Sequence, residues 1–159
     1  MRLDPPLSLA LALALGLAAQ PAAGGLTCPP GWENATSACD QTECTAPMGG
    51  GLIRVDRYAS VAGTTLEEAF ASLEKAVGAD GTPLHELESE SPVEVAGLPG
   101  LKRVYTGSAR GVDLRITMVL TRDAGKDILL RAIWTIENDG LLSLLIAPSI
   151  EGWDPRETD

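Results

Sequence analysis

Few residues in this chain have the types and spacing that catalysis requires. The sequence contains one histidine, His85, and Glu86 follows it, but no second histidine completes a zinc-protease motif. A serine hydrolase would have to use His85 as its base, and the glycine-flanked Ser108 is not placed as in a nucleophile elbow. We therefore predict no catalytic residue, no cofactor-binding residue and no metal ligand. A small exported hydrolase or other enzyme that uses His85 and nearby acids is the alternative.

Acidic side chains are the second group that could do chemistry. Glu86, Glu88 and Glu90 share one face if this stretch is a strand, and their carboxylates could then bind a hard cation such as calcium. A solvated acidic edge that discourages strand-to-strand aggregation explains them more simply. Residues 61–100 hold eight acids against one lysine, whereas residues 101–131 hold seven bases against three acids. We expect these two stretches to complement each other's charge within one fold.

Three cysteines, Cys28, Cys39 and Cys44, lie close together in a stretch rich in proline, glycine, threonine and asparagine. Their spacing matches no zinc site, and it differs from the Cys-x-x-Cys motif of redox enzymes. We expect a local disulfide that stabilises this stretch by roughly 3 kcal/mol. Three pairings are possible, and each leaves an odd thiol that is free or links two chains into a covalent homodimer.

An uncharged run of leucine and alanine over residues 7–19 follows Arg2 and precedes small residues. This pattern predicts a secretory signal peptide over residues 1–24. The run is shorter than the roughly 20 residues that span a bilayer, so we expect no stable membrane insertion after cleavage. The protein is predicted to be periplasmic or extracellular, where thiols oxidise. The leader and an excess of arginine over lysine, nine to three, favour a bacterial origin.

The rest of the chain divides into two predicted parts. Residues 25–51 are expected to form an irregular, cysteine-containing segment that ends in the glycine hinge 49–51. Residues 52–159 are expected to form a single domain that begins with a strand over residues 52–59. No glycine motif that binds nucleotide phosphates occurs in the sequence.

One convincing helix follows the first strand. Thr65 lies three residues before Glu68, which is the spacing of a capping box, and Gly78 ends the pattern. The apolar residues after Thr65 recur at helical spacing and form one stripe: Leu66, Phe70, Leu73 and Val77. This stripe predicts a helix that packs on a sheet.

Alternation of apolar and polar residues is strongest over residues 112–120 and repeats over residues 127–137. Pairing these strands symmetrically about Ala124 places Trp134 opposite Leu114 and gives apolar pairs along one face. A loop over residues 138–140 then predicts a third strand that includes residues 141–146. The predicted fold is α+β, with one amphipathic helix packed on the Trp134 face of an antiparallel meander sheet.

The opposite face of this predicted sheet is more apolar than a solvated face should be. Other parts of the chain could cover this face, namely the first strand, the disulfide segment or the tail with Ile150 and Trp153. The alternative is that a protein partner, a second copy or an apolar ligand covers it. The residues predicted to form this possible interface are Val119, Leu129, Ile133, Leu141 and Leu145.

The sequence therefore predicts a small exported, non-enzymatic protein that binds an unknown protein or an apolar ligand through its sheet. The net charge of −10 argues against binding to nucleic acid or anionic lipid through bulk electrostatics. The same order of strands and helices occurs in proteins with many different functions, so it indicates no specific role.

Overall fold

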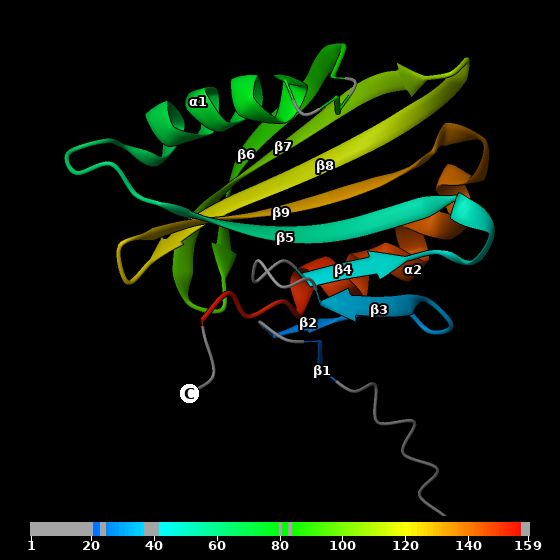
Figure 1. The fold of residues 1–159 in the computed structure, drawn as a ribbon, viewed down its shortest axis with the longest axis horizontal. Helices are drawn as coiled ribbons and strands as arrows, with labels where there is room; N and C mark the ends of the chain where they lie inside the picture. The colour runs from blue at the N-terminus through cyan, green and yellow to red at the C-terminus, as the bar shows by residue number, and fades with distance from the viewer. Residues whose placement is uncertain (1–20, 23–24, 37–41, 80, 83, 157–159) are drawn as a thin grey trace, which may run out of the picture.

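The computed structural model describes residues 21–22, 25–36, 42–79, 81–82 and 84–156. The main strands are β3 (Glu33–Thr36), β4 (Thr42–Thr45), β5 (Gly51–Ala59), β6 (Glu86–Val95), β7 (Leu98–Ala109), β8 (Val112–Asp123) and β9 (Lys126–Thr135). The other elements are strands β1 (Pro21–Ala22) and β2 (Leu26–Thr27), helices α1 (Leu66–Ala79) and α2 (Asp139–Glu151), and short 3-10 helices η1 (Pro47–Gly49) and η2 (Ile136–Asn138). The main strands form one antiparallel sheet in the order β3-β4-β5-β9-β8-β7-β6 (Figure 1). The predicted α+β class is confirmed.

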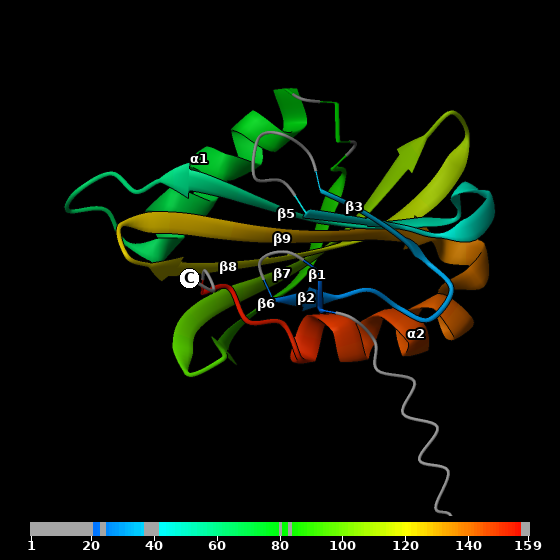
Figure 2. The same cartoon turned by 60° about the horizontal axis from the view of Figure 1, so that its bottom comes forward.

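Helix α1 covers one face of the sheet, and α2 lies against the other (Figure 2). The α1 capping box is present: the backbone N–H of Thr65 donates to a Glu68 carboxylate oxygen at 2.9 Å, and the N–H of Glu68 donates to Thr65 Oγ1 at 3.2 Å. Phe70 and Val77 are both 0% exposed and pack with side chains of β7 and β8. The sequence-predicted helix and its buried stripe are therefore confirmed.

Strands β8 and β9 pair one residue away from the predicted register. Their turn holds only Ala124 and Gly125, which both have positive φ, 48° and 74°. Turns of this kind are favoured in hairpins because their twist matches that of the strands. Since a one-residue slip exchanges the faces that meet, Trp134 pairs with Arg115 and lies in the α2-side core, away from Phe70. The predicted symmetry about Ala124 is wrong.

The predicted third strand over residues 141–146 is also wrong, because these residues belong to α2. Their run of leucine and isoleucine has no strong period, and periodicity then cannot separate a buried strand from a buried helix. The second edge of β9 is moreover occupied, since β5 pairs along it from Gly51 to Ala59. No edge of β9 is left for the expected strand.

The segment before β5 is more regular than predicted. Strand β4 pairs with β5, placing Cys44 opposite Ile53, and β3 pairs with β4 at the edge of the sheet. Gly51 is also more than a hinge: a Cβ there would lie 2.6 Å from Trp32 Cη2, so only glycine leaves room for this ring. Residues 33–36 and 42–45 of the segment that the sequence predicts to be irregular thus extend the main sheet.

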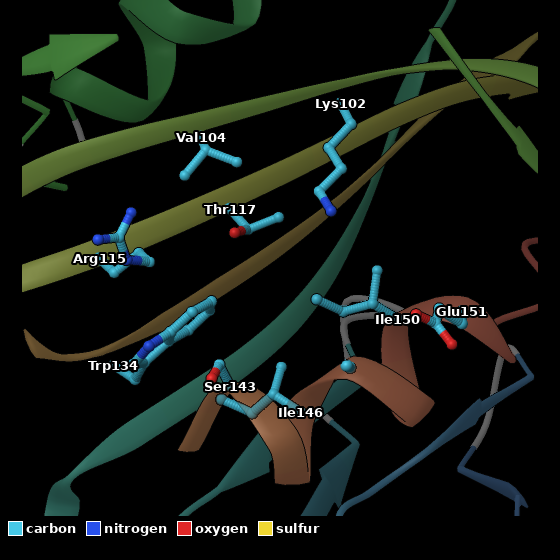
Figure 3. A pocket seen from close by; sticks show the side chains of 10 residues that line it. Lys102, Val104, Arg115, Thr117, Trp134, Ser143, Ile146, Ile150 and Glu151 are labelled. Carbon is cyan, nitrogen blue, oxygen red and sulfur yellow. The ribbon is translucent and has the colours of Figure 1, made fainter. Parts of the chain in front are cut away.

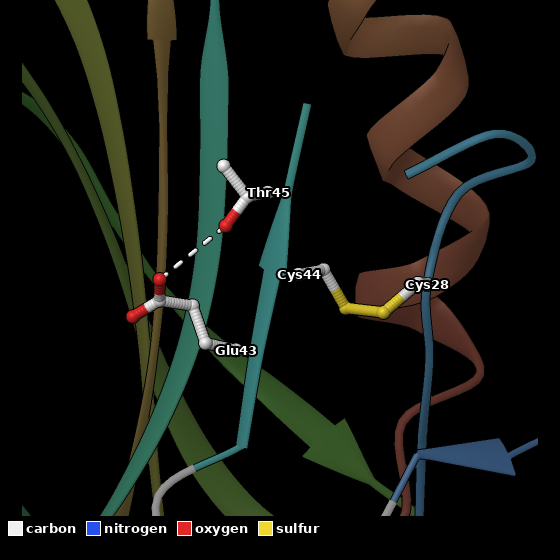
Figure 4. Close-up of a disulfide and its surroundings, with 4 residues drawn as sticks. All are labelled: Cys28, Glu43, Cys44 and Thr45. Atoms are coloured by element: carbon white, nitrogen blue, oxygen red, sulfur yellow. Dashed lines mark hydrogen bonds between the residues drawn. A yellow bond between two sulfur atoms is a disulfide. The ribbon is translucent and has the colours of Figure 1, made fainter. Parts of the chain in front are cut away.

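A disulfide joins Cys28 to Cys44 beside α2 (Figure 4). In the same view Cys44 points toward the α2 side, whereas Glu43 and Thr45 point to the other side of β4 and are joined by a 3.3 Å hydrogen bond. The third candidate, Cys39, lies outside the described residues, as does nearly all of the predicted signal peptide over residues 1–24.

The tail closes the core on the α2 side. Trp153 is 1% exposed, and the backbone N–H of Asp154 donates to the carbonyl of Gly25 at 3.2 Å. Arg57 Nη2 donates to the carbonyl of Pro155 at 3.1 Å. The disulfide segment, the tail and α2 together cover much of this face. The disulfide segment and the tail are among the covers that the sequence allowed, whereas α2 was not predicted. Among the described residues, no helix is long and apolar enough to cross a membrane.

Candidate functional site

Helix α2 covers only part of its face of the sheet, and a groove lies between it and the strands β7 and β8. Helix α2 packs chiefly against β9, and Lys102, Val104 and Arg115 on this side of β7 and β8 stay half-buried. The groove encloses about 220 Å³. It is lined by Lys102, Val104, Arg115, Thr117, Trp134, Ser143, Ile146, Ala147, Ile150 and Glu151 (Figure 3).

The two walls of the groove follow from strand and helix periodicity. Lys102 and Val104 lie two positions apart on β7, and Arg115 and Thr117 lie two positions apart on β8. Since Val104 also pairs with Thr117, all four side chains point to the same face of the sheet. The helix wall uses residues 143–151 of α2, spaced by three and four, which lie on one side of a helix. A sheet face and a helix side therefore converge on one space.

One end of the groove is held by a polar cluster. Arg115 forms an ion pair with Glu88, and its Nε lies 3.2 Å from Asp139 Oδ1. The same Asp139 oxygen accepts a hydrogen bond from Trp134 Nε1 at 2.6 Å. The Arg115 charge is therefore opposed by two carboxylates, and the hydrogen bond to Asp139 orients the Trp134 ring at this end of the groove.

The other end of the groove carries charges on both walls. Lys102 extends from β7 across the groove toward Ile150 and Glu151 of α2 (Figure 3). Within the described parts of the chain, no ion pair joins Lys102 to Glu151, although both line the same space. An ammonium and a carboxylate therefore face the mouth of the groove without neutralising each other.

A second space lies on the α1 side and has a structural explanation. It measures about 390 Å³ and is lined by Leu52, Arg54, Thr82, Arg131 and Ile133. Arg131 is 6% exposed, and its Nη2 lies 2.5 Å from the buried Asp56 carboxylate, which Arg54 Nε also approaches at 3.1 Å. Both arginines contact the buried Asp56 carboxylate, which gives them a structural role in stabilising that charge.

Two of the three β6 acids considered as cation ligands contact arginines instead. Glu88 pairs with Arg115, and Glu90 accepts a hydrogen bond from Arg103 at 2.5 Å. Burial acts to lower the pKa of Arg103, but hydrogen bonds from it to Glu90 and Glu74 raise that pKa above its usual value. These contacts join the acidic and basic stretches, as the sequence predicts. No group of three or more potential metal ligands gathers in the described residues.

His85, on which the enzymatic alternative depends, lies exposed just before β6. Its backbone N–H donates to the carbonyl of Thr106 at 2.9 Å. His85 and Glu86 do not line the groove.

The five predicted interface residues do not form one surface. Val119 is 2% exposed in the α2-side core, whereas Leu129 is 0% exposed in the α1-side core. Ile133 is half-buried on the α1 side, Leu145 packs against the α2-side core, and Leu141 is 63% exposed on α2. Val119 pairs with Leu130 on β9, and Leu145 belongs to helix α2, so the predicted register does not bring these residues together.

Sequence reasoning missed the groove residues because it placed Trp134 on the other face and residue 143 on a strand. One signal was present in β8. Its α2-facing positions change from the polar Arg115 and Thr117 to the apolar Val119. A strand face that is polar over one half and apolar over the other indicates that its cover is partial.

Comparisons with known proteins identify the fold but no family. No protein-family model matches the chain. No curated protein matches it either. Solved structures are similar. Protein PA94 of Pseudomonas aeruginosa, a protein of unknown function, has 15% identity and a TM-score of 0.60, covering 84% of this chain and 92% of its own.

Two further solved structures resemble the chain to the same degree. Cyanobacterial PsbP (CyanoP) of Synechocystis sp. PCC 6803 has 12% identity and a TM-score of 0.61, covering 82% of this chain and 85% of its own. LpqN of Mycobacterium tuberculosis has 14% identity and a TM-score of 0.57, covering 79% of this chain and 78% of its own. At such identities the likeness concerns the fold alone.

Proposed function

We propose that this chain is a small exported, non-enzymatic protein of bacterial origin that binds a small ligand in the groove between β7, β8 and α2. The observation that carries the proposal is the groove itself. It combines apolar walls from Val104, Ala147 and Ile150 with hydroxyls and charges at defined places. Concave, largely apolar sites with a few convergent polar groups are typical of ligand-binding pockets.

Export is supported by two independent features. The leucine and alanine run behind Arg2 has the pattern of a signal peptide. The disulfide between Cys28 and Cys44 is of a kind that persists in oxidising compartments. LpqN, one of the proteins of similar fold, is described as involved in cell envelope biogenesis. A role in the periplasm or outside the cell agrees with all three.

A binding role fits the residues of the groove better than catalysis does. The charged groups at one end, Arg115 and Asp139, are engaged with each other and hold the wall in place. His85, the only imidazole in the sequence, lies outside the groove. Replacing His85 with alanine is expected to leave ligand binding unchanged.

Fragment binding followed by nuclear magnetic resonance tests the proposal. Cyclohexanol, 4-methylpentanol and indole are titrated into the isotope-labelled mature protein. We expect shifts to concentrate at backbone amides of residues 102–104, 115–117 and 143–151, which carry the groove. Val104→Trp fills the groove and should abolish these shifts. The matched control Val112→Trp, at a position 45% exposed in the β7–β8 turn region, should retain them.

The proposal fails if the fragments cause no shifts, or if the shifts lie elsewhere. It also fails if Val104→Trp folds normally and binds the fragments as well as the unsubstituted protein does. Melting temperatures of both tryptophan variants distinguish a filled groove from an unfolded chain.

A further inference from the structure

We propose that the groove selects a small zwitterion with an apolar side chain, the chemistry of a free aliphatic amino acid. In this arrangement Lys102 binds the ligand carboxylate, Glu151 binds its ammonium group, and the apolar body lies against the half-buried Val104, Ala147 and Ile150. The inference rests on the proposed function of the groove and specifies its ligand.

The charges at the mouth carry the argument. Lys102 belongs to β7 and Glu151 to the last turn of α2, so opposite charges face the same space from different walls (Figure 3). Neither forms an ion pair among the described residues. A ligand with one negative and one positive group satisfies both side chains, and each contact is a charge-assisted hydrogen bond.

The end of α2 adds to this polarity. The helix ends at Glu151, and the carboxyl end of a helix carries a partial negative charge that attracts cations and repels anions. A purely anionic ligand would meet repulsion from Glu151 and from this helix end. A purely cationic ligand would meet repulsion from Lys102. A zwitterion avoids both penalties when its ammonium group lies toward the helix and its carboxylate toward β7.

The size and the remaining lining agree with a small ligand. The volume of this open groove, about 220 Å³, is below the roughly 300–1,000 Å³ of pockets that hold drug-sized molecules. The hydroxyls of Ser143 and Thr117 lie between the charged mouth and the Trp134 wall, where they can donate to or accept from a bound polar group. An aliphatic side chain of the size of leucine suits the apolar portion.

Calorimetric titration of the mature protein with three matched compounds tests the inference. L-leucine has both charges, 4-methylpentanoate lacks the ammonium group, and 3-methylbutylamine lacks the carboxylate. We expect L-leucine to bind roughly five-fold or more tightly than either analogue, the value of one exposed charge pair at the upper end of its range.

Variants of the two charges should respond in opposite ways. Lys102→Met should weaken L-leucine and 4-methylpentanoate roughly five-fold and leave 3-methylbutylamine unweakened. Glu151→Gln should weaken L-leucine by a similar factor but strengthen 4-methylpentanoate. The control Lys75→Met removes an exposed lysine on α1, on the other face of the sheet, and should change none of these affinities.

The inference is overturned if 4-methylpentanoate or the amine binds as tightly as L-leucine, or if Lys102→Met and Glu151→Gln leave L-leucine binding unchanged. In those cases the uncharged 4-methylpentanol still reports on the groove: if its shifts persist at the groove amides, the proposed function stands and only the zwitterion is refuted. If neither L-leucine nor 4-methylpentanol binds, both the zwitterion inference and the proposed function fail.

Discussion

The disulfide between Cys28 and Cys44 offers a quantitative test of how the N-terminal segment contributes to stability. The bridged residues are 16 positions apart, and closing a loop of this length removes unfolded-state entropy worth about 3 kcal/mol in the chain-entropy model. For a body of about 130 residues, such a loss lowers the melting temperature by about 10 °C. Replacing both cysteines by alanine should therefore cause a shift of this size.

Thermal unfolding followed by circular dichroism, with and without reductant, measures the effect. Reductant should lower the melting temperature of the unsubstituted protein but not that of the Cys28→Ala, Cys44→Ala double variant. Cys39→Ser is the matched control and should melt as the unsubstituted protein does. A reductant-induced shift below about 3 °C, or an equal loss in Cys39→Ser, would refute the reasoning that this bridge restrains the unfolded chain.

Three further outcomes can be measured on the same protein. Arg131→Met should cost about 2 kcal/mol in chemical denaturation because it removes one of the two arginines that contact the buried Asp56 carboxylate, whereas the double variant with Asp56→Leu should recover part of this loss. Thr65→Ala should cost about 1 kcal/mol by removing the α1 cap, and an unchanged midpoint would contradict the capping role. Hydrogen bonds from Arg156 lower the pKa of Asp154, so this contact stabilises the tail above the usual pKa of an aspartate and loses its effect as the pH falls through the lowered value. Arg156→Gln should return that pKa toward its usual value in a carboxyl titration followed by magnetic resonance.

Local signals in the sequence predict α1 and the central strands well. The Thr65 and Glu68 spacing needs only one helical turn to act, and the hydrogen bonds of the capping box are present as expected. The alternation over residues 112–120 likewise depends only on strand geometry. The predictions of these elements agree with the structure because each depends on residues that lie only a few positions apart in the sequence.

The register between β8 and β9 and the helical structure of α2 depend on contacts between residues distant in sequence. Nothing in the sequence marks Ala124 for a positive φ, since alanine rarely adopts this conformation. The one-residue error that follows moves Trp134 to the wrong face. Residues 141–146 likewise give no sign that β5 pairs along β9. This pairing occupies the edge of β9 at which they were predicted to add a strand. The groove is built from both of these features, so sequence reasoning could not locate it.

The hydrogen bond between Gly25 and Asp154 brings the two ends of the folded body together. A short connection there would allow a circularly permuted chain, opened at the exposed Arg110–Gly111 turn. Strands β7 and β8 would then sit at opposite ends of the new chain while keeping their ladder. Recognition of the ligand by such a permutant would depend on the assembled sheet alone, independent of the order in which its strands are synthesised.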